Sequence, residues 1–248
     1  MDRIYDTHYS GILNRDMHFL IYGRTGVPMI AFPCQDGMCD NWESFQMPDI
    51  LADHIDQGNI QLFCVDTVDN ESWSDINGDK AHRAQMQEAY YHYIIDEALP
   101  RIRSINGTGN LPITTGFSLG ATHAAIVFLR RPELFLGMLG CSGCYDASYF
   151  FGDWCDSTLY DNSPVQFLAN MPNDHPYIDI YNQKRIAFCV GQGAWEDEGR
   201  RTAGILKEIF ERKGIHAWVD FWGYDVNHDW PWWKKQIRYF LPWLLGWR

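Results

Sequence analysis

The sequence feature that most constrains this fold is a serine between two glycines, in the pattern G-x-S-x-G at residues 116–120. β-branched residues precede the pattern, and a helix-forming run follows it over residues 121–130. On a sharp strand-to-helix turn, side chains two positions either side of the serine would collide with neighbouring backbone, so glycine is favoured there. The turn exposes the hydroxyl and directs the first N–H groups of the helix at one point. The pattern therefore predicts a nucleophile elbow around Ser118.

Strands and helices are expected to alternate along the rest of the chain. The strands are expected at 16–22, 28–33, 60–66, 113–115, 136–141, 185–191 and 216–223, and the helices at 42–58, 80–103, 121–130, 200–213 and 233–245. The first two strands are expected to pair around the turn at 23–26. This order predicts one α/β domain over residues 1–248, with a mostly parallel central sheet and helices on both faces.

One segment, residues 145–184, interrupts the alternation. It is irregular, aromatic and proline-containing, and we expect a single helix in it at 164–170. We interpret the segment as an insertion that forms a wall facing a bound substrate.

A serine on such a turn needs a base to accept its proton and an acid to orient that base. In elbow hydrolases the acid follows the last strand but one, and the histidine follows the last strand. The chain has 9 histidines, and only His228 lies in the loop after the final predicted strand. We therefore predict His228 as the base.

The acid loop, residues 192–198, ends in three carboxylates, those of Glu196, Asp197 and Glu198. We predict Glu196, because its side chain reaches further than that of Asp197; Asp225, in the histidine loop, is a remote alternative. The first oxyanion-binding donor is expected to be the N–H of Leu119. The second is expected in the loop at 34–37, where we favour Gln35, although the loop could equally be a plain turn.

Composition excludes several classes of partner. The formal net charge of -12 argues against a nucleic-acid partner or an anionic membrane surface. No run approaches the length of a membrane span. Seven cysteines scattered through predicted strands fit a reducing compartment, and the first residues lack an apolar signal core, so we expect a cytoplasmic location. The C-x-x-C pattern of Cys141 and Cys144 is interpreted as two structural thiols rather than a redox or zinc site.

Five stretches together resemble the esterase D-like family of α/β-hydrolases, in a bacterial branch: FPCQDG at 32–37, FCVDTVDNESW at 63–73, GFSLGA at 116–121, GQGAWED at 191–197 and NHDWPWW at 227–233. The resemblance covers nearly the whole chain. It implies the α/β-hydrolase fold, serine carboxylesterase chemistry and a homo-oligomer. The family acts on varied esters and thioesters, so the resemblance leaves the substrate open. The loop at 34–37 lacks the His-Gly pair common in hydrolases, which leaves the second oxyanion donor open as well.

The predicted function is hydrolysis of a small carboxylic ester or thioester through an acyl-enzyme, without a cofactor or a metal. Two alternatives remain open: an acyltransferase with the same three residues, and a non-catalytic binding protein. Eleven tryptophans are abundant for this length. Trp195 and Trp154 are the candidates for substrate contact, because both fall in loops that this fold could gather near the serine; packing is the alternative role.

Overall fold

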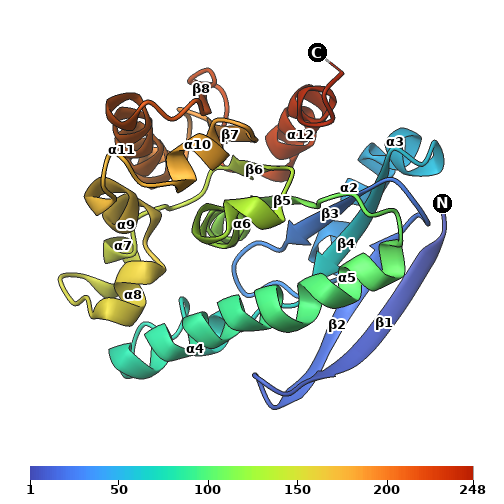
Figure 1. The fold of residues 1–248 in the computed structure, drawn as a ribbon, viewed down its shortest axis with the longest axis horizontal. Coiled ribbons are helices and arrows are strands. Elements are labelled where there is room, and N and C mark those ends of the chain that lie inside the picture. Colours follow the sequence, from blue (N-terminus) through green and yellow to red (C-terminus); the bar gives the residue numbers. More distant parts are fainter. Residues whose placement is uncertain (248) are drawn as a thin grey trace.

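A sheet of eight strands runs through the computed structural model, which describes residues 1–247 (Figure 1). Residue 248, the last of the predicted domain, lies outside the described residues. The strand order is β1-β2-β4-β3-β5-β6-β7-β8. Strands β3 to β8 are parallel to one another, whereas β1 and β2 form an antiparallel hairpin whose second strand joins β4. The bounds are β1 Arg3–Ser10, β2 Arg15–Tyr22, β3 Val27–Phe32, β4 Ile60–Val65, β5 Ile113–Phe117, β6 Gly137–Cys141, β7 Arg185–Val190 and β8 Trp218–Phe221.

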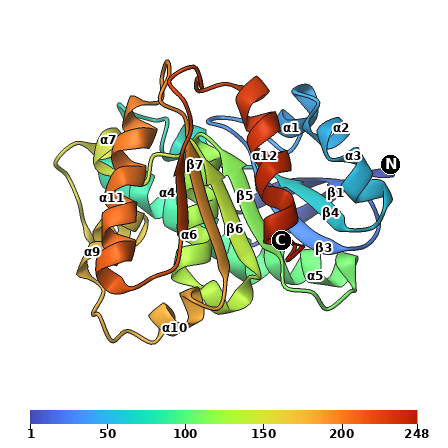
Figure 2. The ribbon, with the colours of Figure 1, turned by 90° about the horizontal axis from the view of Figure 1, so that it is seen from above.

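Helices cover both faces of the sheet, because successive strand residues point to opposite sides. One core lies under α4 (Lys80–His92), α5 (Leu99–Asn106), α6 (Leu119–Arg130) and α11 (Asp197–Lys213). The other lies under α1 (Asn41–Ser44), α2 (Met47–Ile50), α3 (Ala52–Asp56) and α12 (Trp230–Leu244). Figure 2 shows α11 and α12 on opposite sides of β6 and β7. The prediction of a mostly parallel sheet with helices on both faces is confirmed.

Four predicted elements differ from the structure, and one strand, β1, was not predicted. The strands at 16–22 and 28–33 are not neighbours, because β4 lies between them. The helix expected at 42–58 is divided into α1, α2 and α3, since Gln46 adopts a left-handed φ of 58° and Pro48 lies in the first turn of a new helix. The long helix at 80–103 forms, but a π-helical stretch, Tyr93–Ala98, joins α4 to α5.

The segment 145–184 contains the expected helix, α9 (Pro164–Asn170), and three more short helices: α7 (Ser148–Phe151), α8 (Ser157–Asp161) and α10 (Tyr177–Tyr181). Two 3-10 turns complete the described elements, Asp69–Glu71 after β4 and Pro132–Leu134 after α6. No helix within residues 1–247 is both long and apolar enough to cross a membrane.

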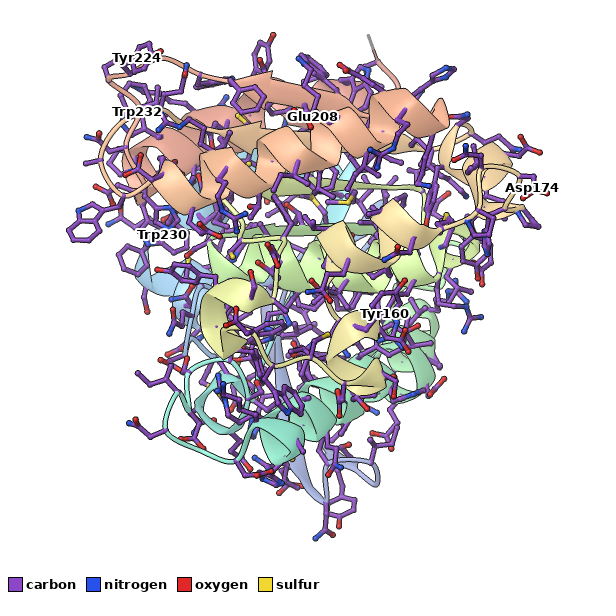
Figure 3. The ribbon with its side chains drawn as sticks, turned by 90° about the vertical axis from the view of Figure 1, so that its left-hand side faces the viewer. Tyr160, Asp174, Glu208, Tyr224, Trp230 and Trp232 are labelled. Atoms are coloured by element: carbon purple, nitrogen blue, oxygen red, sulfur yellow. The ribbon has the colours of Figure 1, made fainter. Side chains whose placement is uncertain are left out.

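The loops that follow the parallel strands gather at one end of the molecule. In Figure 3, Tyr224 and Trp230 mark this end, and Asp174, which lies before β7, marks the opposite end. The carboxyl ends of parallel strands are where an open α/β sheet places its ligand site. The candidate residues are therefore expected at the end of the molecule that holds Tyr224.

Candidate active site

The serine turn has the strained backbone that its sequence predicts. Ser118 joins β5 to α6 with φ 54° and ψ -130°, a conformation that a residue with a side chain rarely adopts. A Cβ at Gly116 would lie 2.3 Å from the Gly120 carbonyl, and one at Gly120 would lie 2.4 Å from the Pro33 oxygen. The two glycines are required because the backbone passes too close for any side chain.

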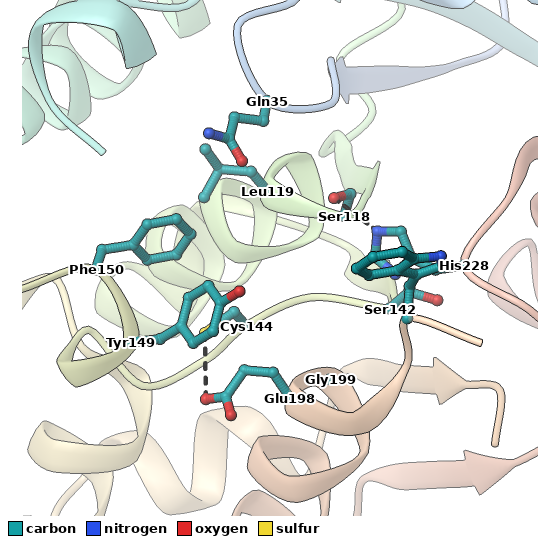
Figure 4. Close-up of a pocket in the computed structure, with 11 residues that line it drawn as sticks. Gln35, Ser118, Leu119, Ser142, Cys144, Tyr149, Phe150, Glu198, Gly199 and His228 are labelled. Carbon is teal, nitrogen blue, oxygen red and sulfur yellow. Dashed lines mark hydrogen bonds between the residues drawn. The ribbon is translucent and has the colours of Figure 1, made fainter. Parts of the chain in front are cut away.

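Ser118, His228 and Glu196 lie in one hydrogen-bonded row, although they come from three separate loops. His228 Nε2 is 2.9 Å from Ser118 Oγ, and His228 Nδ1 is 3.3 Å from Glu196 Oε2. The Glu196 side chain is fully buried beside the partly exposed imidazole. Figure 4 shows Ser118 and His228 facing each other at the edge of a pocket.

The other candidate acids point elsewhere. Asp197 is exposed and pairs with Arg200 at 2.9 Å. Asp225 is exposed on its loop. Glu198 lines the pocket, but its carboxylate forms an ion pair with Arg201. Of the carboxylates that the sequence offers, Glu196 is the one that contacts the imidazole.

Ser142 belongs to this site and was not predicted. Its hydroxyl donates to Glu196 Oε1 at 2.6 Å and accepts from Trp233 Nε1 at 3.1 Å. The Gly191 N–H also approaches Glu196 Oε1, at 3.3 Å. The C-x-x-C pattern at 141–144 draws attention to its cysteines, whereas the serine between them makes the contact. Its position directly after β6, next to the serine strand, is the signal that could have found it.

The imidazole is further held by packing and by backbone contacts. The Trp233 ring meets it edge-on, with ring centroids 5.0 Å apart. The His228 N–H donates to the Ala194 carbonyl at 3.0 Å, and the Ala194 N–H donates to the Asn227 side chain at 2.8 Å. These bonds tie the loop that carries Glu196 to the loop that carries His228.

The residues of both expected oxyanion donors line the pocket, and in Figure 4 the Gln35 side chain lies above that of Leu119. Leu119 is the first residue of α6, so its N–H has no carbonyl to bond within the helix. Within residues 1–247 neither the Leu119 N–H nor the Gln35 N–H donates a hydrogen bond. Both amides are therefore free to bind an oxygen.

The pocket has a volume of about 310 Å³. Its lining comes from the loops after five strands: Gln35, Ser118, Leu119, Ser142, Cys144, Tyr149, Phe150, Trp195, Glu198, Gly199 and His228. Trp195 stands at the rim with 88% of its surface exposed and a left-handed φ of 65°. Trp154 is absent from the lining among the described residues, and its ring stacks on Phe151.

The segment 145–184 contributes to the pocket only around α7, through Tyr149 and Phe150.

The two cysteines of the C-x-x-C pattern are buried thiols. Burial raises the pKa of the Cys144 thiol to about 12, and burial also raises the pKa of the Cys141 thiol. Both cysteines are free, and because their pKa values are raised they are neutral thiols at neutral pH. This agrees with the interpretation of the pattern as two structural thiols.

Several solved structures superpose on nearly the whole chain. A fluorophosphonate-binding serine hydrolase of Staphylococcus aureus is 12% identical, with a TM-score of 0.75, and the match covers 99% of this chain and 98% of that one. An S-formylglutathione hydrolase of Agrobacterium tumefaciens is 13% identical, with a TM-score of 0.73 and coverage of 98% and 94%. A ferulic acid esterase of Anaeromyces mucronatus is 11% identical, with a TM-score of 0.70 and coverage of 99% and 91%. These likenesses establish the α/β-hydrolase fold.

A family profile described as "Putative esterase" matches residues 10–244. The chain therefore belongs to this esterase family and is a serine carboxylesterase-type hydrolase. No curated protein sequence matches it. Membership of the family does not assign roles to individual residues.

Proposed function

We propose that the protein hydrolyses a small carboxylic ester or thioester, with Ser118 as nucleophile, His228 as base and Glu196 as the acid that orients the base. The observation that carries the proposal is the 2.9 Å contact between Ser118 Oγ and His228 Nε2. A serine hydroxyl is a weak nucleophile unless an adjacent base accepts its proton. The elbow exposes that hydroxyl to the pocket.

In the first step Ser118 Oγ forms a bond to the carbonyl carbon of the ester while its proton moves to His228 Nε2. The Glu196 carboxylate accepts the hydrogen bond from Nδ1–H and stabilises the imidazolium that results. The carbonyl oxygen becomes an oxyanion, which the N–H groups of Leu119 and Gln35 bind. The imidazolium then protonates the leaving alcohol or thiol, and the acyl group stays on Ser118.

In the second step water replaces the alcohol. His228 removes a proton from the water as its oxygen attacks the acyl-enzyme, and the tetrahedral intermediate is bound by the same two N–H groups. When the intermediate collapses, Ser118 Oγ recovers its proton from His228. A free carboxylic acid leaves, and the enzyme returns to its starting state.

The pocket lining favours an uncharged substrate. Among the described residues that line it there is no lysine or arginine, and the only charged carboxylate besides the buried row is that of Glu198. Trp195, Tyr149 and Phe150 offer ring faces at the rim and the wall, where a flat group of the substrate could stack. We assign substrate contact to these three, with Trp154 supporting the wall through Phe151.

We also propose a cytoplasmic homo-oligomer built from single-domain subunits. All seven cysteines are free, which suits a reducing compartment. The oligomer is supported by the family resemblance alone. Size-exclusion chromatography with light scattering measures the mass of the assembly, and a monomeric mass at micromolar concentration would overturn the proposed oligomer.

The test of the proposed roles is labelling with a fluorophosphonate, followed by peptide mass mapping and p-nitrophenyl acetate turnover. We expect one adduct, on Ser118, and loss of turnover by at least about 10³-fold in Ser118→Ala and in His228→Ala. Ser157→Ala, an exposed serine at the start of α8, is the matched control and keeps full labelling and turnover. Full turnover in folded Ser118→Ala protein would exclude the proposal.

Product analysis with and without an alcohol acceptor separates hydrolysis from acyl transfer. Release of free acid at an unchanged rate in the presence of the acceptor identifies a hydrolase. Formation of a new ester identifies an acyltransferase that uses the same residues.

A further inference from the structure

A buried pair, Asp69 and His123, lies outside the pocket lining and takes no part in the proposed chemistry. His123 Nε2 is 2.8 Å from Asp69 Oδ1, and both side chains are at most 1% exposed. His123 belongs to α6, one helical turn after Leu119. Asp69 lies in the loop after β4. The pair therefore links the serine helix to a separate loop.

The histidine is held in one orientation. Its ring stacks on Phe32 and meets the ring of Tyr90 edge-on, at centroid distances of 6.0 Å and 5.1 Å. Its Nδ1 atom is buried and has no hydrogen-bond partner within residues 1–247. A proton on Nδ1 would thus be buried without an acceptor, so Nε2 carries the proton and donates it to Asp69.

The second oxygen of Asp69 reaches the loop that carries Gln35. Asp69 Oδ2 accepts the N–H of Asp36 at 3.2 Å. Asp36 itself has a left-handed φ of 58°, which an L-residue adopts only at a cost of about 1–2 kcal/mol. A hydrogen bond is needed to hold such a residue in this conformation. The Asp36 N–H that makes the bond is the next backbone donor along the chain after the N–H of Gln35.

Other hydrogen bonds also hold this loop, but none of them involves the Asp36 N–H. The Gly37 N–H donates to the Cys34 carbonyl at 2.8 Å, and Thr67 Oγ1 donates to the Gly37 carbonyl at 3.0 Å. The Cys39 N–H donates to Asp66 Oδ1 at 2.9 Å. Among the described residues Asp69 is thus the side chain that bonds the backbone of the left-handed residue beside Gln35.

We infer that Asp69 and His123 are positioning residues that set the distance between the two oxyanion donors. One element, α6, carries the Leu119 N–H directly and holds the Gln35 N–H through the bonds from His123 to Asp69 to Asp36. The inference rests on the proposed function. It adds that the oxyanion site is completed by a side-chain pair that does not touch the substrate.

The test compares variants that break the pair with variants that preserve its hydrogen bonds. In Asp69→Ala and His123→Leu we expect kcat to fall by about 10–100-fold with KM changed by less than about threefold, because the donor acts on the oxyanion and not on the bound ester. In His123→Gln the amide N–H can still donate to Asp69, so this conservative variant is expected to stay within about fivefold of the parent protein. In Asp69→Asn the amide can still accept from Asp36, but donating to His123 Nε2 would place the ring proton on the buried Nδ1, so we expect an intermediate loss of kcat.

An inhibitor measurement separates positioning from a loss of stability. A trifluoromethyl ketone forms an oxyanion on the serine, so its Ki should rise in Asp69→Ala and His123→Leu by the same factor as kcat/KM falls. Asn106→Ala is the matched control, because Asn106 is a buried polar residue that bonds the Gly26 carbonyl and Gln61 at the amino ends of the strands. It should lower the unfolding midpoint and leave kcat and Ki unchanged.

Two results would overturn the inference while the parent enzyme remains active. One is a kcat in His123→Leu and Asp69→Ala no lower than in Asn106→Ala. The other is a defect confined to KM. If Asp69→Ala does not fold, the pair His123→Gln and His123→Leu decides the question by the same readouts. Inactive parent protein would instead count against the proposed function.

Discussion

At the scale of single residues, the site depends on groups that hold the reacting ones. Glu196 is buried, and a buried carboxylate is stable only where hydrogen bonds replace its water. Ser142 and the Gly191 N–H supply those bonds to the oxygen that does not face His228. Ser142 has a left-handed φ of 57°, so the backbone is strained at the point that delivers its hydroxyl.

Ser142→Ala is therefore expected to lower kcat/KM by about tenfold. The change removes one hydrogen bond to a charged group, worth about 1.5–3 kcal/mol, of which part is expressed in the transition state. Steady-state turnover of p-nitrophenyl acetate measures it. The control is Ser163→Ala, which removes a buried hydroxyl that accepts the Ala147 N–H, and which should leave turnover unchanged. Equal turnover in both variants would show that Glu196 needs no support from Ser142.

At the scale of elements, close approaches of backbone decide which residues are tolerated. The β5–α6 turn admits no side chain at Gly116. In contrast, Gly204 lies within α11, where an added Cβ would have no heavy atom within 4 Å. The same substitution at these two positions should have opposite effects.

Gly116→Ala is expected to destabilise the protein by about 1–3 kcal/mol or more, because the backbone of Gly120 has to move. Gly204→Ala is expected to stabilise it by up to about 1 kcal/mol, since alanine is the better helix former. Urea unfolding followed by tryptophan fluorescence measures both. A stable Gly116→Ala protein with normal turnover would contradict the strained geometry of the elbow.

Local sequence predicted most elements but not those set by distant contacts. Central strands such as β5 and β7 are buried on both faces, and their β-branched and apolar residues could be recognised directly. Strand β1 was missed because its inner face is polar, with Asp6 paired to Arg101 and His8 to Tyr93. The positions of Ser118 and His228 follow from their order along the chain, whereas that order limits the acid only to the loop at 192–198. Ser142 requires knowledge of which strands are neighbours.

At the scale of the whole molecule, stability should depend on pH through the contact between β1 and the helical rod of α4 and α5. His8 packs on Phe19 and bonds Tyr93 Oη at 2.9 Å. Burial lowers the pKa of His8 below its usual value of 6.5. Between the two pKa values the unfolded chain binds the proton and the folded one does not, so stability falls as pH falls through this range.

His8→Gln should reduce this dependence. The difference in free energy of unfolding between the parent protein and His8→Gln is expected to shrink as the pH falls below about 6.5. Urea unfolding at several pH values between 5 and 8 measures it. Thr7→Ala, an exposed change on the same strand, should shift the curve without changing its slope. Parallel curves for His8→Gln and the parent protein would contradict the prediction.

The distance along the chain between Ser118 and His228 has a consequence for biosynthesis. The two side chains are 110 positions apart and meet only after β6, β7 and β8 have joined the sheet. Contacts of such long range form late in refolding, since they close the largest loops. The time course with which turnover returns after dilution from denaturant should therefore report when the sheet is complete. On the proposed mechanism, a ribosome-bound chain that has not yet released His228 carries a serine elbow without its base and is expected to be inactive.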